Sequence, residues 1–142
     1  MLFRSGSFVA FALQQTGKRY VLGAEAKASD PNPRAFDCSE LVEWSAARAG
    51  IKGVPDGSSA QLAHVKKITV FQAIHTKGAL LFMPGHVAIS LGNGKTIEAM
   101  NPSQGVRQGN ATGRAWTAGG VLPNAKGYSI AAPAKSTSGR VE

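Results

Sequence analysis

Three residues of this sequence have types suited to nucleophilic catalysis: Cys38, His86 and Glu98. Cys38 is the only cysteine among 142 residues, so it cannot form a disulfide within the chain. A thiolate can attack a carbonyl carbon, an imidazole can take the proton of the thiol, and a carboxylate can orient the imidazole. Taken singly, these residues have plainer interpretations: an inert core cysteine, a strand-edge histidine and a solvated strand carboxylate. The catalytic interpretation therefore depends on whether the fold brings them together.

The segment that starts at Cys38 has the pattern of an amphipathic helix. Counted from Cys38, small and apolar residues recur at i+3, i+4, i+7, i+8 and i+11: Leu41, Val42, Ser45, Ala46 and Ala49. Asp37 stands where an N-cap carboxylate belongs, and Gly50 stands where a helix would end. We therefore predict a helix over residues 38–49, with the thiol at its N-terminus, where free N–H groups favour the thiolate.

The clearest hairpin in the sequence joins residues 86–91 to residues 95–100. If only Asn93 and Gly94 formed the turn, Glu98 would point into the apolar face, which is an unfavourable place for a carboxylate. A three-residue loop that includes a glycine in the left-handed conformation shifts the register by one residue. One face then collects the apolar residues Val87, Ile89, Leu91, Ile97 and Ala99. Because a one-residue slip exchanges the two faces, the apolar pattern favours the three-residue loop.

The same register places His86 and Glu98 on the other face, diagonal to each other, with the small Ala88 between them. Diagonal Cβ atoms lie about 7–8 Å apart, a distance that the two side chains can bridge. Glu98 would then fix the imidazole tautomer and leave the other ring nitrogen for Cys38. Asn101 is a second candidate for the residue that orients the histidine.

The rest of the sequence predicts the elements that support this helix and hairpin. A first helix should run from Ser5 or Ser7 to about Gln15, and a short helix should follow a cap at Ser58 or Ser59. Further expectations are an extended piece at 18–23, a buried strand at 79–83, a loop at 101–118, a strand opening at Trp116 with Gly119-Gly120 as a break, and a closing strand at 128–131. We expect one domain over residues 1–132 and a flexible tail over residues 133–142.

Composition favours a globular domain with a basic surface, which we expect to be a monomer. The chain is 43% hydrophobic, which suffices for a buried core, and its 16 basic and 8 acidic residues give a net charge of +8. Its scattered basic residues predict attraction to polyanions, such as an anionic cell-wall polymer, rather than a specific nucleic-acid groove. We expect no membrane span, no signal peptide in residues 1–15, and neither a metal site nor a cofactor.

Two motifs together resemble the NlpC-type cell-wall peptidases, which are small papain-like cysteine peptidases. The motifs are Phe36-Asp37-Cys38-Ser39-x-Leu41-Val42 and Gly85-His86-Val87-Ala88-Ile89-x-Leu91-Gly92-Asn93-Gly94, followed by Ile97-Glu98-Ala99. The resemblance implies a papain-like α+β fold, in which N-terminal helices pack on an antiparallel sheet and the nucleophile begins a helix. It also implies that Cys38 is the nucleophile and His86 the base, with Tyr20, Asp37 and Ser39 near the oxyanion or the substrate.

The resemblance implies hydrolysis of peptide bonds in peptidoglycan stem peptides or cross-links, through an acyl-enzyme on Cys38, at the bacterial cell wall. The third catalytic position is usually histidine in this family, and here Glu98 or Asn101 would take it. Glu40 stands where glycine is usual and would bring an acidic side chain close to the substrate.

Three alternatives remain open: an N-acetylmuramoyl-L-alanine amidase, an acyltransferase, and a non-catalytic wall-binding module. Glutamate at the third position and the expected lack of a signal peptide also resemble phage lytic enzymes and phage-tail peptidase domains. The chain would then be secreted, carried by a virion or delivered by another system, or it would be one domain of a longer protein.

Overall fold

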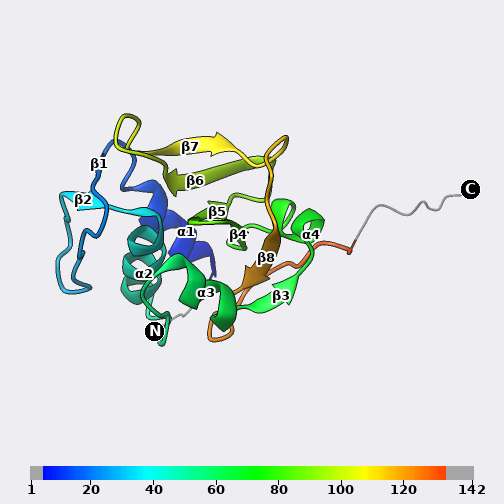
Figure 1. Cartoon of the computed structure of the whole chain (residues 1–142). Helices are drawn as coiled ribbons and strands as arrows, with labels where there is room; N and C mark the ends of the chain where they lie inside the picture. The colour runs from blue at the N-terminus through cyan, green and yellow to red at the C-terminus, as the bar shows by residue number, and fades with distance from the viewer. Residues whose placement is uncertain (1–4, 134–142) are drawn as a thin grey trace, which may run out of the picture.

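The computed structural model describes residues 5–133 and has the α+β architecture that the sequence predicts (Figure 1). Its helices are α1 (Ser5–Leu13), α2 (Cys38–Arg48), α3 (Ser58–His64) and α4 (Val70–Ile74). Its strands are β1 (Arg19–Tyr20), β2 (Ala35–Phe36), β3 (Lys66–Ile68), β4 (Leu80–Met83), β5 (His86–Ser90), β6 (Lys95–Ala99), β7 (Val106–Asn110) and β8 (Ala118–Val121). Strands β3 to β8 form one antiparallel sheet in the order β3-β8-β4-β5-β6-β7, and β1 pairs with β2 in parallel.

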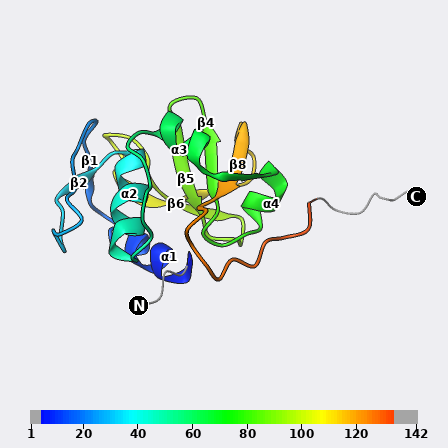
Figure 2. The ribbon, with the colours of Figure 1, turned by 90° about the horizontal axis from the view of Figure 1, so that it is seen from below.

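Helices cover both faces of the six-stranded sheet. Helices α1 and α2 lie side by side on one face, and α4 lies on the opposite side of the sheet (Figure 1 and Figure 2). The cluster beneath α1 and α2 contains the predicted apolar face of the hairpin: Val87, Ile89, Leu91, Ile97 and Ala99. A second cluster on the other face contains Ala88 and Trp116. Because both faces are covered, a carboxylate on the second face is buried and needs hydrogen-bond partners.

Helix α2 begins at Cys38, as predicted, and Asp37 caps it. The Asp37 side chain accepts a hydrogen bond from the backbone nitrogen of Glu40, with Oδ1 and N 2.8 Å apart. Trp44, which lies off the predicted apolar stripe, is also buried and packs edge-on against Phe11 of α1. This packing fixes the position of α2, and therefore of the thiol at its start.

The hairpin has the predicted three-residue loop. Ile89 pairs with Ile97, and Ser90 pairs with Thr96. Gly92 has a φ of 80°, and a Cβ at this position would lie 2.7 Å from the backbone nitrogen of Lys77. Only glycine fits this turn without displacing the neighbouring backbone.

Several expectations for other segments are wrong. Residues 101–118 are not one loop, because they contain the edge strand β7. Gly119 and Gly120 lie inside β8 rather than breaking a strand. A Cβ on Gly119 would lie 2.7 Å from Cβ of Ala73, since α4 packs directly on this strand. Helix α3 starts where predicted, but Gly57 occupies the N-cap position and no side chain caps the helix.

Residues 128–131 do not form the predicted closing strand. The segment is instead attached through Tyr128, whose hydroxyl accepts a hydrogen bond from the Leu122 nitrogen at 3.1 Å. The expected tail over residues 133–142 lies outside the described residues apart from Pro133, so the division at residue 132 stays a prediction. Within residues 5–133, none of the helices has the length and apolarity needed to cross a membrane.

Candidate active site

Cys38 lies where the start of α2 meets the turn between β4 and β5. The residue is 7% exposed, so the thiol is nearly buried and yet reachable. Its Sγ lies 3.9 Å from the carbonyl oxygen of Gly85, the residue that precedes β5. Since His86 is the first residue of β5, the turn brings the imidazole to the thiol.

His86 contacts Glu98, as the hairpin register predicts. Its Nε2 lies 2.7 Å from Oε1 of Glu98, and the thiol of Cys38 lies near enough to affect the pKa of the imidazole. Burial lowers the pKa of His86, but the hydrogen bonds and charges of Cys38 and Glu98 outweigh burial and raise the pKa to about 9. The imidazole therefore lies between the Glu98 carboxylate and the Cys38 thiol, and both groups favour its protonated form.

Glu98 is buried, and both of its carboxylate oxygens accept hydrogen bonds. Oε1 accepts from His86 and from Nη2 of Arg114 at 2.9 Å; Oε2 accepts from Nη1 of Arg114 at 2.7 Å and from the hydroxyl of Thr96. Burial raises the pKa of Glu98, but the hydrogen bonds from these three residues and the charge of Arg114 lower it to about 2. Glu98 is therefore a carboxylate at neutral pH.

Asn101, the second candidate, has a different role in the structure. Its Oδ1 accepts hydrogen bonds from the backbone nitrogens of Ser103 at 3.1 Å and Gln104 at 2.9 Å, which closes the turn between β6 and β7. Of the two candidates, Glu98 is the residue whose side chain contacts His86.

Arg114 and Trp116 also belong to this site. The sequence patterns did not indicate them, because both residues lie in the segment predicted as a loop. The guanidinium carbon of Arg114 lies 4.5 Å from the centroid of the Trp116 ring. Trp116 in turn stacks on His86, with ring centroids 6.3 Å apart and an interplanar angle of 18°. The one available signal was Glu98 itself, because a carboxylate on a buried strand face needs a cation, and Arg107 and Arg114 are the first basic residues after it.

The predicted oxyanion and substrate residues surround the start of α2. Burial, and then the charges of Cys38 and Asp37, raise the pKa of Tyr20, so its hydroxyl remains a hydrogen-bond donor. Ser39 donates to Oδ1 of Asp37 at 3.1 Å, and Oδ2 of Asp37 accepts from the backbone nitrogen of Gly23 at 3.0 Å. These contacts order the helix start, and a direct role in substrate binding stays a prediction.

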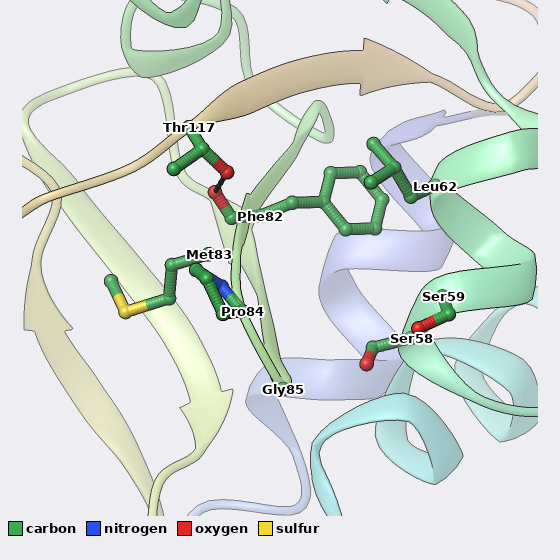
Figure 3. Close-up of a pocket in the computed structure, with 8 residues that line it drawn as sticks. All are labelled: Ser58, Ser59, Leu62, Phe82, Met83, Pro84, Gly85 and Thr117. Carbon is green, nitrogen blue, oxygen red and sulfur yellow. Dashed lines mark hydrogen bonds between the residues drawn. The ribbon is translucent and has the colours of Figure 1, made fainter.

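A pocket of about 150 Å³ lies between α3 and the end of β4, beside Gly85 (Figure 3). Side chains of α3 face the end of β4 and the following turn across it, and its lining carries no charge: Ser58, Ser59, Leu62, Phe82, Met83, Pro84, Gly85 and Thr117. Gly85 links the pocket to the site, because its carbonyl oxygen contacts Sγ of Cys38. The pocket therefore suits a small uncharged group next to the thiol.

Glu40 does not present its carboxylate to a substrate, contrary to expectation. It is 4% exposed, and its Oε1 accepts from the backbone nitrogen of Ala26 at 3.1 Å. Its carboxylate lies among those of Glu25 and Asp56, with one oxygen of each within 4.8 Å of the others. Burial, and then the charge of Glu43, raise the pKa of Glu40 to about 7. Partial protonation near neutral pH reduces the repulsion within this acidic group.

Comparison with known proteins identifies the family. Residues 17–122 match the NlpC/P60 family. The chain is 34% identical over 113 residues to probable endopeptidase p60 of Listeria monocytogenes, covering 76% of this chain and 21% of that protein. It is 37% identical over 97 residues to the bifunctional muramidase/DL-endopeptidase CwlT of Bacillus subtilis, covering 62% of this chain and 27% of that protein. The chain thus spans only a minor part of the length of these curated relatives.

The solved structures include RipD of Mycobacterium tuberculosis, described as a non-catalytic NlpC/p60 domain protein adapted to peptidoglycan binding. The solved RipD chain matches with a TM-score of 0.69 and 25% identity, over 84% of this chain and 96% of that chain. The helix layer, the six-stranded antiparallel sheet and the position of Cys38 at the start of α2 agree with a papain-like α+β fold. With the family match spanning residues 17–122, this chain belongs to the NlpC/P60 family.

Proposed function

We propose that this chain is a cysteine peptidase that hydrolyses peptide bonds in peptidoglycan stem peptides or cross-links at the bacterial cell wall. The observation that carries the proposal is the juxtaposition of Cys38, at a helix N-terminus and in contact with Gly85, with the next residue His86, whose Nε2 lies 2.7 Å from Oε1 of Glu98. The relatives p60 and CwlT are named endopeptidases, and RipD is described as adapted to peptidoglycan binding; together they support a peptidoglycan peptide as the substrate. Secretion, a virion or another delivery route stays a prediction.

In the proposed reaction, His86 takes the proton of the Cys38 thiol, and the thiolate attacks the carbonyl carbon of the scissile peptide bond. The backbone N–H of Cys38, at the start of α2, and the Tyr20 hydroxyl donate to the oxyanion that forms. The tetrahedral intermediate then expels the amine, which His86 protonates, and a thioester remains on Cys38. Water, deprotonated by His86, attacks the thioester and releases a carboxylate product and the thiol.

Glu98 serves this reaction by holding Nε2 of His86, which leaves Nδ1 free to take the proton of the thiol. A carboxylate in this position also stabilises the imidazolium that forms during attack. The neutral pocket beside Gly85 would accept a small side chain, such as the methyl group of an alanine, next to the scissile bond. The substrate would therefore be a peptide with a small uncharged residue beside the cleaved bond.

A second function, wall binding without catalysis, is favoured by the similarity to RipD. The net charge of +8 would support retention on an anionic wall polymer. The complete set of thiol, imidazole and carboxylate supports hydrolysis instead, since wall binding alone requires none of their contacts.

Digestion of purified peptidoglycan, followed by mass spectrometry of the soluble fragments, tests the proposal. A peptidase releases fragments with a new amine inside the stem peptide, whereas an amidase releases whole stems from the sugar. A wall-binding module sediments with the peptidoglycan and releases neither product. Whole-stem release, or retention without products, would overturn the proposed reaction.

A further inference from the structure

The carboxylate that orients His86 has a charged partner to which the proposed reaction gives no role. The Glu98 side chain is 0% exposed, and Arg114 donates to both of its oxygens, at 2.7 and 2.9 Å. A buried carboxylate with only an imidazole and a hydroxyl as partners tends to take up a proton. The guanidinium offsets this tendency, and its planar fork also fixes the rotation of the carboxylate.

Arg114 is itself held in place by its surroundings. Its Nη1 donates to the backbone oxygen of Asn110 at 3.0 Å, and its guanidinium lies over the Trp116 ring. Trp116 is fixed by a 2.7 Å hydrogen bond from its indole nitrogen to the backbone oxygen of Ala111, and its ring also stacks on the ring of His86. The segment between β7 and β8 therefore contacts both the imidazole and, through Arg114, the carboxylate that orients it.

The neighbouring strand β7 leaves room for this arrangement. A Cβ on Gly109 would lie 3.0 Å from Oε2 of Glu98 and 3.1 Å from Oγ1 of Thr96, closer than most side-chain contacts. On the solvent side, Arg114 lines an open pocket of about 420 Å³ together with Gly109, Gly113 and Arg107. A small cation from solvent can therefore reach the position of the guanidinium if the Arg114 side chain is removed.

We propose that Arg114 is a positioning residue, which holds the Glu98 carboxylate in the orientation that keeps Nε2 of His86 bound and Nδ1 directed to Cys38. Glu98 and Arg114 then act as one unit, and the carboxylate alone is insufficient. The inference rests on the proposed function only where turnover is the readout, because the reactivity of the thiol can be measured without any substrate.

Turnover of peptidoglycan fragments by variants of Arg114 tests this role. We expect Arg114→Ala to lower kcat by roughly ten- to a hundredfold with little change in KM, because a charge-assisted contact is lost and no substrate contact is removed. Arg114→Lys keeps the positive charge but not the planar fork of the guanidinium. Its kcat should therefore lie between those of Arg114→Ala and wild type. Arg107→Ala is the matched control, because Arg107 pairs with Glu98 only through the β6–β7 ladder and its side chain, which lines the same pocket, donates to the Gln108 carbonyl instead; we expect kcat within about twofold of wild type.

Chemical rescue separates positioning from a general structural role. Free guanidinium, added at concentrations far below those that denature proteins, should restore part of the kcat of Arg114→Ala, whereas urea should not. Removing Arg114 also lets Glu98 take up a proton at higher pH, so the acidic limb of the pH–kcat profile should move to higher pH. An unchanged profile, or equal effects of guanidinium and urea, would overturn the positioning role.

The rate at which iodoacetamide alkylates Cys38, measured against pH, gives a readout without substrate. Arg114→Ala should shift the acidic limb of this rate to higher pH, and Arg107→Ala should not. If wild type releases no wall fragments, the proposed function fails, while this alkylation profile still tests Arg114. If Arg114→Ala does not fold, Arg114→Gln, which keeps a polar side chain without the charge, provides the same measurement, and a wild-type alkylation profile in that variant would overturn the proposal.

Discussion

Replacing Glu98 by glutamine keeps the shape of the side chain and removes its charge. Arg114 donates to both carboxylate oxygens, while His86 shares Oε1 and Thr96 shares Oε2. A glutamine offers one accepting oxygen and one donating NH₂ group. In either orientation of the amide, one guanidinium nitrogen of Arg114 therefore faces a donor, and the arginine loses its counter-charge.

The structure gives the size of this effect by two routes. The pKa of Glu98 lies at about 2 against an ordinary value of 4.5, which corresponds to about 3 kcal/mol in favour of the ionised form in the folded protein. Removing one partner of a buried ion pair costs roughly 3–5 kcal/mol, and the 26% exposure of Arg114 favours the lower end. We therefore expect Glu98→Gln to lower the free energy of unfolding by about 3 kcal/mol near neutral pH.

Urea unfolding at several pH values measures this loss. Because the pKa of Glu98 is lowered in the folded state, its stabilisation is present above 4.5 and is lost as the pH falls toward about 2. The stability difference between wild type and Glu98→Gln should therefore shrink over that range, and kcat of the variant should be sharply reduced at neutral pH. Equal stabilities near neutral pH, or a difference that does not change with pH, would refute the account of Glu98.

The remaining predictions concern the other parts of the site. Asn101→Ala should keep nearly full turnover, because Asn101 closes a turn and does not contact His86, and a loss as large as that of Glu98→Gln would transfer the orienting role to Asn101. The pKa of His86 is raised from 6.5 to about 9, so the stability that its protonated form contributes is present below pH 6.5 and is lost as the pH rises through about 9. The value of kcat/KM should fall over the same rise through about pH 9, and a fall that begins below pH 8 would contradict this role of the imidazolium. Gly109→Ala should lower stability by roughly 1–3 kcal/mol and reduce kcat by crowding Glu98, as urea unfolding and turnover would measure. Gly6→Ala in α1, where a Cβ meets no atom within 4 Å, should cause neither loss, and comparable losses in both variants would contradict the crowding argument.

Local patterns predicted the two elements that carry the proposed nucleophile and base. The spacing of apolar residues after Cys38 and the N-cap residue Asp37 are properties of one helix, and the hairpin register follows from its two faces. The pairing of His86 with Glu98 could be inferred because both residues belong to the same hairpin.

The other half of the site depends on contacts between distant segments. Strand β7 lies at the edge of the sheet and exposes polar residues, so it lacks the alternating pattern that identifies a strand. Arg114 reaches Glu98 only because this strand and the following turn fold back over the hairpin. Gly119 resembles a strand break in the sequence, but in the fold it lets α4 approach β8 closely.

Glu40 shows how sequence proximity can mislead. It lies two residues after Cys38, and residues two apart on a helix point in different directions. Its side chain therefore contacts Ala26 beneath the preceding loop instead of the substrate side of Cys38.

The role of Cys38 as the nucleophile is tested most directly by comparing wild type and Cys38→Ala for the release of new amino groups from purified peptidoglycan. We expect wild type to release fragments with new amines inside the stem peptide. Cys38→Ala should release none, although it stays folded and sediments with the wall as wild type does. Equal release by both proteins would contradict the assignment of Cys38 as the nucleophile.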